Sequence, residues 1–428
     1  MKPEQALAVD EINLSDLEFW SRPLEQREGA FKTLREERPV PFFDEPEMVT
    51  GSGFDMPRGP GYYALTRYAD VVYASKHPDT FCSSQGATSI PDLPPVFLEF
   101  FGGMINMDDP KHARQRRIVS AAFSPRMLRK AEEDVQRAAD DIVDRIIGRG
   151  GCDFVTEVAS RLPLKIICDM MGIPESQYDF VLQRSNIILG AGDPEYVPEG
   201  TDIGAALLTA GSELAQLMQE LAAERAQSPT DDLTSALVTA NVDGEHLSHE
   251  ELASFFILLV VAGNETTRNA ISHGLIALTE NPEQRQAWVE DFDGLAPTAV
   301  EEIVRWASPV IFMRRTATEP TEIGSQKLKE GDKVLLFYNS ANRDEEVFDD
   351  PWTFDLRRQP NPHVGFGGPG PHFCLGAHLA RREITVMYRE LLRRVPDIRA
   401  SGEPERLRSN FINGVKHLPC EFTPGPAA

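Results

Sequence analysis

The sequence predicts a mainly helical α+β protein, and three observations support this prediction. From about residue 110 to residue 291 the chain carries long amphipathic stretches with an apolar side chain at every third or fourth position. One stretch, residues 252–281, is apolar on nearly every face of its first half, so we expect a single long, buried helix there. Residues 310–340 instead alternate apolar and polar side chains between glycines, as a small sheet does.

The other elements follow from local signals. In the first hundred residues, Tyr62–Leu65 and Val71–Ala74 are strand or helix candidates between glycines and prolines. Residues 341–373 are rich in Asn, Asp, Pro and Gly and predict a long irregular segment, which is usually functional. Further helices are expected at 126–148, 205–227, 295–307 and 375–394.

We interpret residues 1–428 as one domain. Residues 1–13 are expected to be flexible, and about 1–100 and 310–340 are expected to contribute the β-rich part.

Composition argues against several classes of protein. The 67 acidic and 43 basic residues leave a formal net charge of −24, which disfavours binding to nucleic acid through overall charge. No apolar run reaches the roughly 18 residues of a membrane span, and the N-terminus lacks the apolar core of a signal peptide. Five widely spaced cysteines disfavour a disulfide framework. We therefore expect a cytoplasmic protein without a membrane span.

The segment FGGPGPHFCLG, residues 366–376, predicts a metal ligand. Cys374 follows a Gly-Pro loop and precedes a helix, where the helix N-terminus and backbone N–H groups stabilise a thiolate. Gly376 lets a flat ligand approach the backbone closely. A buried structural cysteine is the alternative, but the framing by Phe366, His372 and Gly376 favours the ligand.

This segment resembles the haem-ligand loop of the cytochrome P-450 family, the haem-thiolate monooxygenases. The resemblance implies the cytochrome P-450 fold, with the long helix lying over the haem and Cys374 as the axial iron ligand. It also implies that His372 hydrogen-bonds a haem propionate and that Phe366 shields the sulfur. Phe366 lies eight residues before Cys374, one more than the commonest spacing, which resembles a bacterial branch that oxidises sterols and methyl-branched lipids.

The string AGNETT, residues 262–267, lies inside the predicted long helix. Gly263 costs about 1 kcal/mol relative to alanine, which suggests that something must come close. Thr266 can bond back to a carbonyl and bend the helix, and Glu265 beside it suits proton delivery to dioxygen. The string is similar to the family's oxygen-binding groove, which implies Gly263 and Thr266 over the iron. A kinked helix with a surface Glu is the alternative, and Glu265 can also act through water or pair structurally.

Glu302 and Arg305 form a Glu-x-x-Arg pair on one helix face, just before a Ser-Pro stop. In the family this pair takes a second arginine from the irregular segment, which implies Arg358, preferred over Arg357, in a structural triad. The same spacing recurs at Glu390/Arg393 and Glu403/Arg406.

Three further basic residues are implied as propionate ligands. His112 and Arg116 lie four apart on one helix face, and Arg315 follows Arg314, the neighbouring alternative. Arginine binds carboxylates through charge-assisted hydrogen bonds. Taken alone, the His112–Arg116 pair is more often a solvated basic face.

Substrate walls are expected from loops that the resemblance assigns to the pocket. Each of these side chains is by itself more often core, but together they describe an apolar channel without a basic anchor for a carboxylate. The candidates are Phe97, Phe101, Met104, Val261, Ala262, Thr267, Val310, Phe312 and Phe411.

The resemblance covers about residues 14–423 and looks closest to methyl-branched lipid ω-hydroxylases. It implies hydroxylation of an unactivated C–H bond with haem b and O2. Because the 428 residues hold no flavin or ferredoxin domain, we expect NAD(P)H to deliver electrons through a separate ferredoxin reductase and ferredoxin. We expect a monomer. The alternatives are a sterol side-chain, terpenoid or polyketide hydroxylase, a haem-thiolate peroxygenase, and a non-catalytic haem or lipid sensor.

Overall fold

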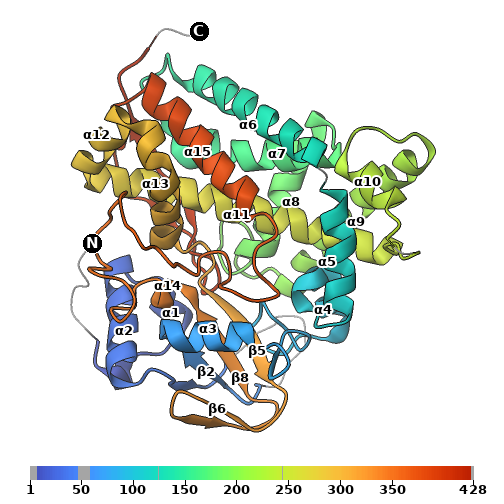
Figure 1. Ribbon diagram of the computed structural model, residues 1–428, viewed down its shortest axis with the longest axis vertical. Helices are drawn as coiled ribbons and strands as arrows, with labels where there is room; N and C mark the ends of the chain where they lie inside the picture. The colour runs from blue at the N-terminus through green and yellow to red at the C-terminus, as the bar shows by residue number, and fades with distance from the viewer. Residues whose placement is uncertain (1–6, 47–57, 124, 243, 426–428) are drawn as a thin grey trace.

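The computed structural model describes residues 7–46, 58–123, 125–242 and 244–425. Helices fill most of the molecule, and a small sheet lies at one end (Figure 1). The mainly helical prediction is therefore confirmed. The helices are α1 (Leu17–Trp20), α2 (Leu24–Glu37), α3 (Tyr68–Lys76), α4 (Pro95–Gly102), α5 (Lys111–Ala122), α6 (Pro125–Ile146), α7 (Arg161–Met171), α8 (Tyr178–Gly190), α9 (Ile203–Gln227), α10 (Leu233–Thr239), α11 (His249–Glu280), α12 (Pro282–Glu290), α13 (Phe292–Ala307), α14 (Tyr338–Ala341) and α15 (Ala377–Arg394).

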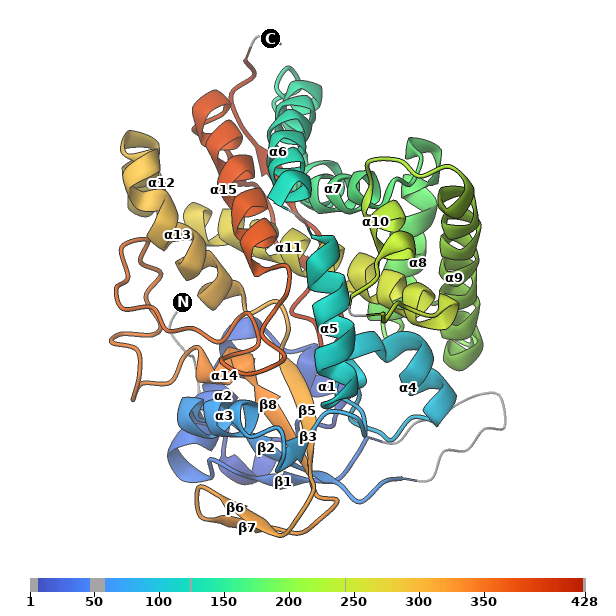
Figure 2. The same ribbon diagram turned by 45° about the vertical axis from the view of Figure 1, so that its right-hand side comes forward.

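Helix α11 runs through the centre of the helical part and contacts α7, α8, α9, α13 and α15 (Figures 1 and 2). It begins with a capping box, in which the Ser248 hydroxyl accepts from the Glu251 N–H and the Glu251 carboxylate accepts from the Ser248 N–H. Most of the helix is buried, yet Ala262 is exposed and Thr266 is half-buried. One face of a core helix is thus open, which marks it as a site. No helix in the described ranges is long and apolar enough to cross a membrane.

The β-rich part is a five-stranded mixed sheet in the order β1-β2-β8-β5-β3. Strands β2 and β8 are parallel, and the other neighbours are antiparallel. Residues 310–340 supply four strands, as predicted, whereas residues 71–74 belong to helix α3. The strands are β1 (Phe42–Phe43), β2 (Tyr62–Leu65), β3 (Phe81–Cys82), β4 (Gly151–Asp153), β5 (Phe312–Ala317), β6 (Thr321–Ile323), β7 (Gln326–Leu328), β8 (Lys333–Phe337), β9 (Arg399–Ala400), β10 (Glu405–Arg406), β11 (Val415–His417) and β12 (Pro419–Glu421).

Part of the segment 1–13, for which we expect flexibility, packs against the rest of the protein. Val9–Glu11 form a short 3-10 helix, and Ile12 is 5% exposed, in an apolar cluster with Phe31 and Phe337. Burial of an apolar side chain against the sheet explains why this segment is held. Residues 1–6 lie outside the described residues.

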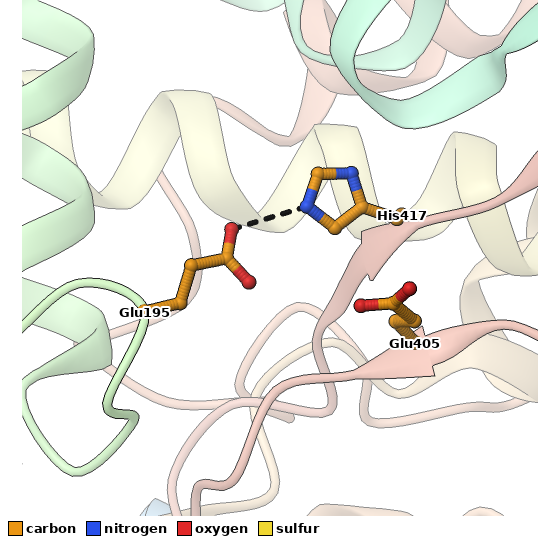
Figure 3. Close-up of side chains that lie close together, drawn as sticks. All are labelled: Glu195, Glu405 and His417. Carbon is orange, nitrogen blue, oxygen red and sulfur yellow. Dashed lines mark hydrogen bonds and ion pairs between the residues drawn. The ribbon is translucent and has the colours of Figure 1, made fainter.

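An ionic network fastens the loop between α8 and α9 to strand β11. Lys416 contacts Asp193 at 3.1 Å and Glu195 at 2.8 Å. The His417 ring contacts the Glu195 carboxylate at 3.1 Å, and Glu405 on the neighbouring strand lies beside them (Figure 3). The loop is therefore held to the hairpin β10–β11 by charges on both sides.

We predict that His417→Gln removes a pH-dependent part of the stability. The hydrogen bond to the Asp153 carboxylate, at 2.5 Å, raises the pKa of His417 above its ordinary value. A group with a raised pKa in the folded state stabilises the fold fully below its unfolded-state pKa. That contribution is lost as the pH rises through the folded-state pKa.

Wild type and His417→Gln should therefore differ most in thermal unfolding midpoint at about pH 5.5 and least at about pH 9. His249→Gln, at an exposed position at the start of α11, is the control and should show no such trend. A His417→Gln difference that stays constant over this pH range would contradict the prediction.

Candidate functional site

The cysteine loop precedes α15, and backbone contacts hold it. The Cys374 N–H donates to the Phe366 carbonyl at 2.9 Å, and helix α15 begins three residues later at Ala377. Burial raises the pKa of the Cys374 thiol, against the opposing effects of the Gly376 N–H and of Arg116 and Arg381. The Gly376 N–H lowers this pKa, as expected at a helix N-terminus, but burial has the larger effect. A bound metal ion deprotonates a coordinating thiol outright.

The surface around Cys374 is open to a ligand. Phe373 is 39% exposed and Leu375 is 36% exposed, although both belong to a loop inside the fold. A Cβ placed on Gly376 would meet nothing within 4 Å, so a flat group can lie against the backbone here. The Arg381 guanidinium lies 4.3 Å from the Phe366 ring centroid and holds that ring beside the loop.

Four basic side chains converge near this loop. The rings of His112 and His372 lie 4.2 Å apart, and Arg116 donates to the Phe373 carbonyl at 2.6 Å. Burial, followed by the charges of Arg315, His112 and Arg116, lowers the pKa of His372 to about 3. The Nε2 of His112 is buried without a hydrogen-bond partner. The His112 Nδ1 lies 3.5 Å from the Asp109 carboxylate, whereas His372, Arg116 and Arg315 form no ion pair among the described residues.

Arg315 is the basic residue that most clearly lacks an acid. It is 4% exposed and donates to the Arg314 carbonyl at 2.7 Å, and among the described residues it forms no ion pair. Arg314, the alternative, is instead paired with Asp92 at 2.7 Å. Because a buried guanidinium is costly without a counter-charge, Arg315 is set to receive a carboxylate from a ligand.

The open face of α11 carries the predicted hydroxyl. The Thr266 Oγ1 donates to the Ala262 carbonyl at 2.8 Å, within an uninterrupted helix. A Cβ on Gly263 would lie 2.5 Å from the Cδ1 of Ile167, so this glycine lets the Ile167 side chain pack closely against α11. From the sequence we expect Gly263 to make room for a ligand, whereas the structure shows that the neighbour at this position is Ile167.

Glu265 is committed to an internal network. Its carboxylate accepts from Arg268 and, at 2.9 Å, from the Asn269 side chain, and it is 2% exposed. Arg268 also donates to Asn186 on α8 at 3.1 Å. The contacts favour structural pairing over direct proton delivery. Arg268 and Asn269 lie three and four residues after Glu265 on the same helix, so both can reach its carboxylate. These two partners are not among the contacts predicted from the sequence.

Glu302, Arg305 and Arg358 lie together. Arg305 donates to both Glu302 oxygens at 2.7 Å, and Arg358 donates at 3.1 Å. The Glu302 and Arg305 side chains are fully buried, and Asn361 adds a further bond at 3.2 Å. Arg305 and Arg358 also donate to carbonyls between residues 342 and 353, so the triad anchors the irregular segment to α13.

The candidate pocket side chains fall into two groups. Ala262 is exposed, and Phe97, Phe101, Val310 and Phe411 are partly buried. Val310 and Phe411 are neighbours, because a β-bridge joins Val310 to Ile412. Met104, Val261, Thr267 and Phe312 are buried.

Phe312, one of the pocket candidates, is packed among aromatic side chains. It is 1% exposed, and its ring lies 5.8 Å from Phe337 and 5.4 Å from Phe411, so it belongs to the aromatic core under the sheet. Alternation in a strand predicts which face a residue takes, but not which face meets the pocket.

Comparison with known proteins agrees with this geometry. A profile described as cytochrome P-450 matches residues 205–396. Methyl-branched lipid omega-hydroxylases of Mycobacterium bovis and Mycobacterium tuberculosis are each 52% identical over 98% of this chain and 97% of theirs. The chain belongs to the cytochrome P-450 family. A steroid C26-monooxygenase of Mycolicibacterium smegmatis is 40% identical over 91% of this chain and 89% of its own length.

Solved structures of cytochromes P-450 show the same architecture. A Mycobacterium marinum cytochrome P-450 in complex with pseudoionone superposes with a TM-score of 0.90 at 44% identity, covering 98% of this chain and 100% of that one. This cytochrome P-450 is thus a monooxygenase of the haem-thiolate class. The family acts on apolar substrates and takes electrons from redox partners.

The residues present fit a haem. Cys374 would supply the thiolate, and the acid-free Arg315 with Arg116, His112 and His372 would receive the two propionates. When bound, the haem supplies activation of dioxygen and insertion of one oxygen atom into a C–H bond. Sequence reasoning did not anticipate Ser83, whose hydroxyl lies 3.1 Å from the His372 Nε2. Ser83 is 289 residues from His372 in the chain, so no local sequence pattern links the two.

We predict that Glu302→Ala yields little folded haem protein. Removing one member of a buried ionic network costs about 3–5 kcal/mol, because two guanidiniums are left without their acid. The measurement is the yield of folded protein and the haem content per chain. Glu403→Ala is the matched control, since Glu403 has the same spacing to an arginine but lies exposed. Normal yield and haem content in Glu302→Ala would refute the prediction.

Proposed function

We propose that this cytochrome P-450 hydroxylates a methyl-branched lipid or fatty acid at its terminal (omega) carbon. The observation that carries the proposal is the 52% identity, over nearly the whole length, to proteins named methyl-branched lipid omega-hydroxylases. The part of this chain that matches those proteins includes the segments that we assign to the substrate walls. The chemistry of those walls agrees with such a substrate, since their side chains are apolar.

The walls come from segments far apart in the chain. Helix α4 brings Phe97 and Phe101, whose rings lie 5.9 Å apart, and it packs against α9, where Gly211 leaves room for Phe101. The tail turn brings Phe411 beside Val310. Aromatic and branched side chains on both sides suit a branched aliphatic chain, which gains from dispersion contacts along its length.

We assign the residues as follows. Cys374 is the axial ligand of haem b, and His372, His112, Arg116 and Arg315 hold its propionates. Phe366 and Gly376 flank the sulfur, while Gly263 lets a side chain of α7 pack closely against α11.

Thr266 passes protons from water toward bound oxygen through its hydroxyl, on the open face of α11. Glu265 keeps the helix in place through Arg268 rather than transferring the proton itself.

An optical titration of the purified ferric protein tests the substrate class. A methyl-branched fatty acid should produce the strongest low-to-high-spin shift and bind about tenfold more tightly than a straight-chain acid of equal length, because each extra buried methyl adds apolar contact. Product analysis should then find the hydroxyl on the terminal carbon. A straight-chain acid that binds equally well, or hydroxylation within the chain, would contradict the proposal.

A sterol side-chain hydroxylase is the second candidate, because a steroid C26-monooxygenase is 40% identical to this chain. A sterol-3-one included in the same titration separates the two. A spin shift strongest with the sterol would favour this candidate over the branched acid. No shift with any of the three, from a protein with bound haem, would direct the search to terpenoids and polyketides.

We predict that Thr266→Ala uncouples electron use from product formation. Loss of the hydroxyl removes the positioned proton donor, so product per NAD(P)H consumed should fall on the order of tenfold while the substrate-induced spin shift stays unchanged. The control is Ser272→Ala, which removes the same kind of back bond, 2.8 Å to the Arg268 carbonyl, further along α11. Unchanged coupling in Thr266→Ala would contradict its role.

Electrons are proposed to come from NAD(P)H through a ferredoxin reductase and a ferredoxin. Basic residues on α5 and α15 support an acidic partner, although Arg114, Arg117 and Arg381 are already paired with Glu251, Glu245 and Glu301. A docking ferredoxin would have to compete with these intramolecular acids.

We further propose a monomer in the cytoplasm. The described cysteines are free thiols, which suits a reducing compartment. Among the described residues, the large apolar side chains that are exposed lie on several elements, with two on α9 and two in the cysteine loop.

A further inference from the structure

Two cysteines outside the haem site face each other across a pair of strands. Cys152 lies on β4 and Cys420 on β12, and the antiparallel register pairs them directly. Their sulfur atoms are 3.5 Å apart. The two residues are separated by 268 positions in the chain, so only the tertiary fold brings them together.

We propose that Cys152 and Cys420 form an oxidisable dithiol that closes to a disulfide when a low-molecular-weight disulfide such as glutathione disulfide is present. Directly paired residues of antiparallel strands have Cα atoms about 4.5–5.5 Å apart, within the range that a disulfide spans. Closing the sulfurs from 3.5 Å to about 2.05 Å therefore requires side-chain rotation rather than backbone movement.

The reaction is a two-step thiol–disulfide exchange. Cys152 is half-buried while Cys420 is 4% exposed, so Cys152 meets the oxidant first. The Cys152 thiolate attacks one sulfur of glutathione disulfide and forms a mixed disulfide, and one glutathione thiolate leaves. The Cys420 thiolate then attacks the Cys152 sulfur and displaces the second. The two cysteines are oxidised by two electrons, and their two protons end on two molecules of reduced glutathione.

The bond would fix the C-terminal strand. Backbone hydrogen bonds already run from Phe154 to Leu418 at 2.9 Å and from Phe422 to Gly150 at 3.1 Å on either side of the pair. A covalent link between them prevents β12 from separating from β4. Because the closed loop is long, the constraint on the unfolded chain is large. Cys374 lies in a different segment, so the haem site is left intact.

The test uses the full-length haem protein, incubated with glutathione disulfide, then unfolded in denaturant and labelled with a maleimide. Wild type should lose two labelled thiols, give a Cys152–Cys420 linked peptide lighter by two hydrogens, and unfold about 5 °C higher. Dithiothreitol should reverse all three changes. Cys82→Ser, at a buried cysteine on another sheet, is the control and should behave as wild type.

Single variants report the order of attack. Cys420→Ser should retain glutathione on Cys152 as a stable mixed disulfide, because no second thiol can displace it. Cys152→Ser should leave Cys420 unmodified, since it is buried. The proposal is overturned if wild type keeps both thiols, if it stops at the mixed disulfide, or if another pair of cysteines becomes linked.

Discussion

The buried carboxylate of Glu302 is the constraint on which the proximal part of this cytochrome P-450 depends. Two guanidiniums, a side-chain amide and the Asp355 N–H all donate to it. The same guanidiniums donate to backbone carbonyls of a segment with little regular structure of its own. Without a helix or sheet ladder, those carbonyls need donors from elsewhere. One ionic cluster therefore gives shape to the chain that leads to the cysteine loop.

The basic side chains and the thiol near the cysteine loop are suited to a negatively charged ligand that contains a metal. Arg116, Arg315, His112 and His372 lie close together near the cysteine loop, and among the described residues only His112 contacts an acid, Asp109 at 3.5 Å. Burial lowers the pKa of His372 to about 3. The thiol of Cys374 likewise has a raised pKa because of burial. Arg116, Arg315, His112 and His372 would receive the propionates of a haem and Cys374 would bind its iron, which would offset both effects. Recognition of the cofactor and stability of the loaded protein are thus coupled.

Helix α11 has one open face and several buried faces, and they carry different side chains. Its open face presents Ala262 and the hydroxyl of Thr266, while its buried faces carry Glu265 in contact with Arg268. Gly263 permits close contact with the Ile167 side chain of α7. The reactive side of the helix is consequently positioned by packing on the sides that never meet the substrate.

The sequence by itself determined the features that depend on local spacing. The long central helix, the irregular segment, the cysteine loop and the Thr266 back bond are all set by residues a few positions apart, where helix period, capping and glycine conformation act. The resemblance then identified the family from those same motifs.

Only the tertiary structure decided between equivalent local patterns. The Glu-x-x-Arg spacing occurs five times in the sequence, but among the described residues only Glu302 is enclosed with a second arginine. Arg314 and Arg315 are adjacent, yet alternation along β5 sends one to Asp92 and leaves the other without an acid. The pairing of Cys152 with Cys420 likewise depends on strand register. These outcomes depend on contacts between segments that are 56 to 268 residues apart in the chain. Burial and charge at those contacts are properties of packing, which local spacing does not encode.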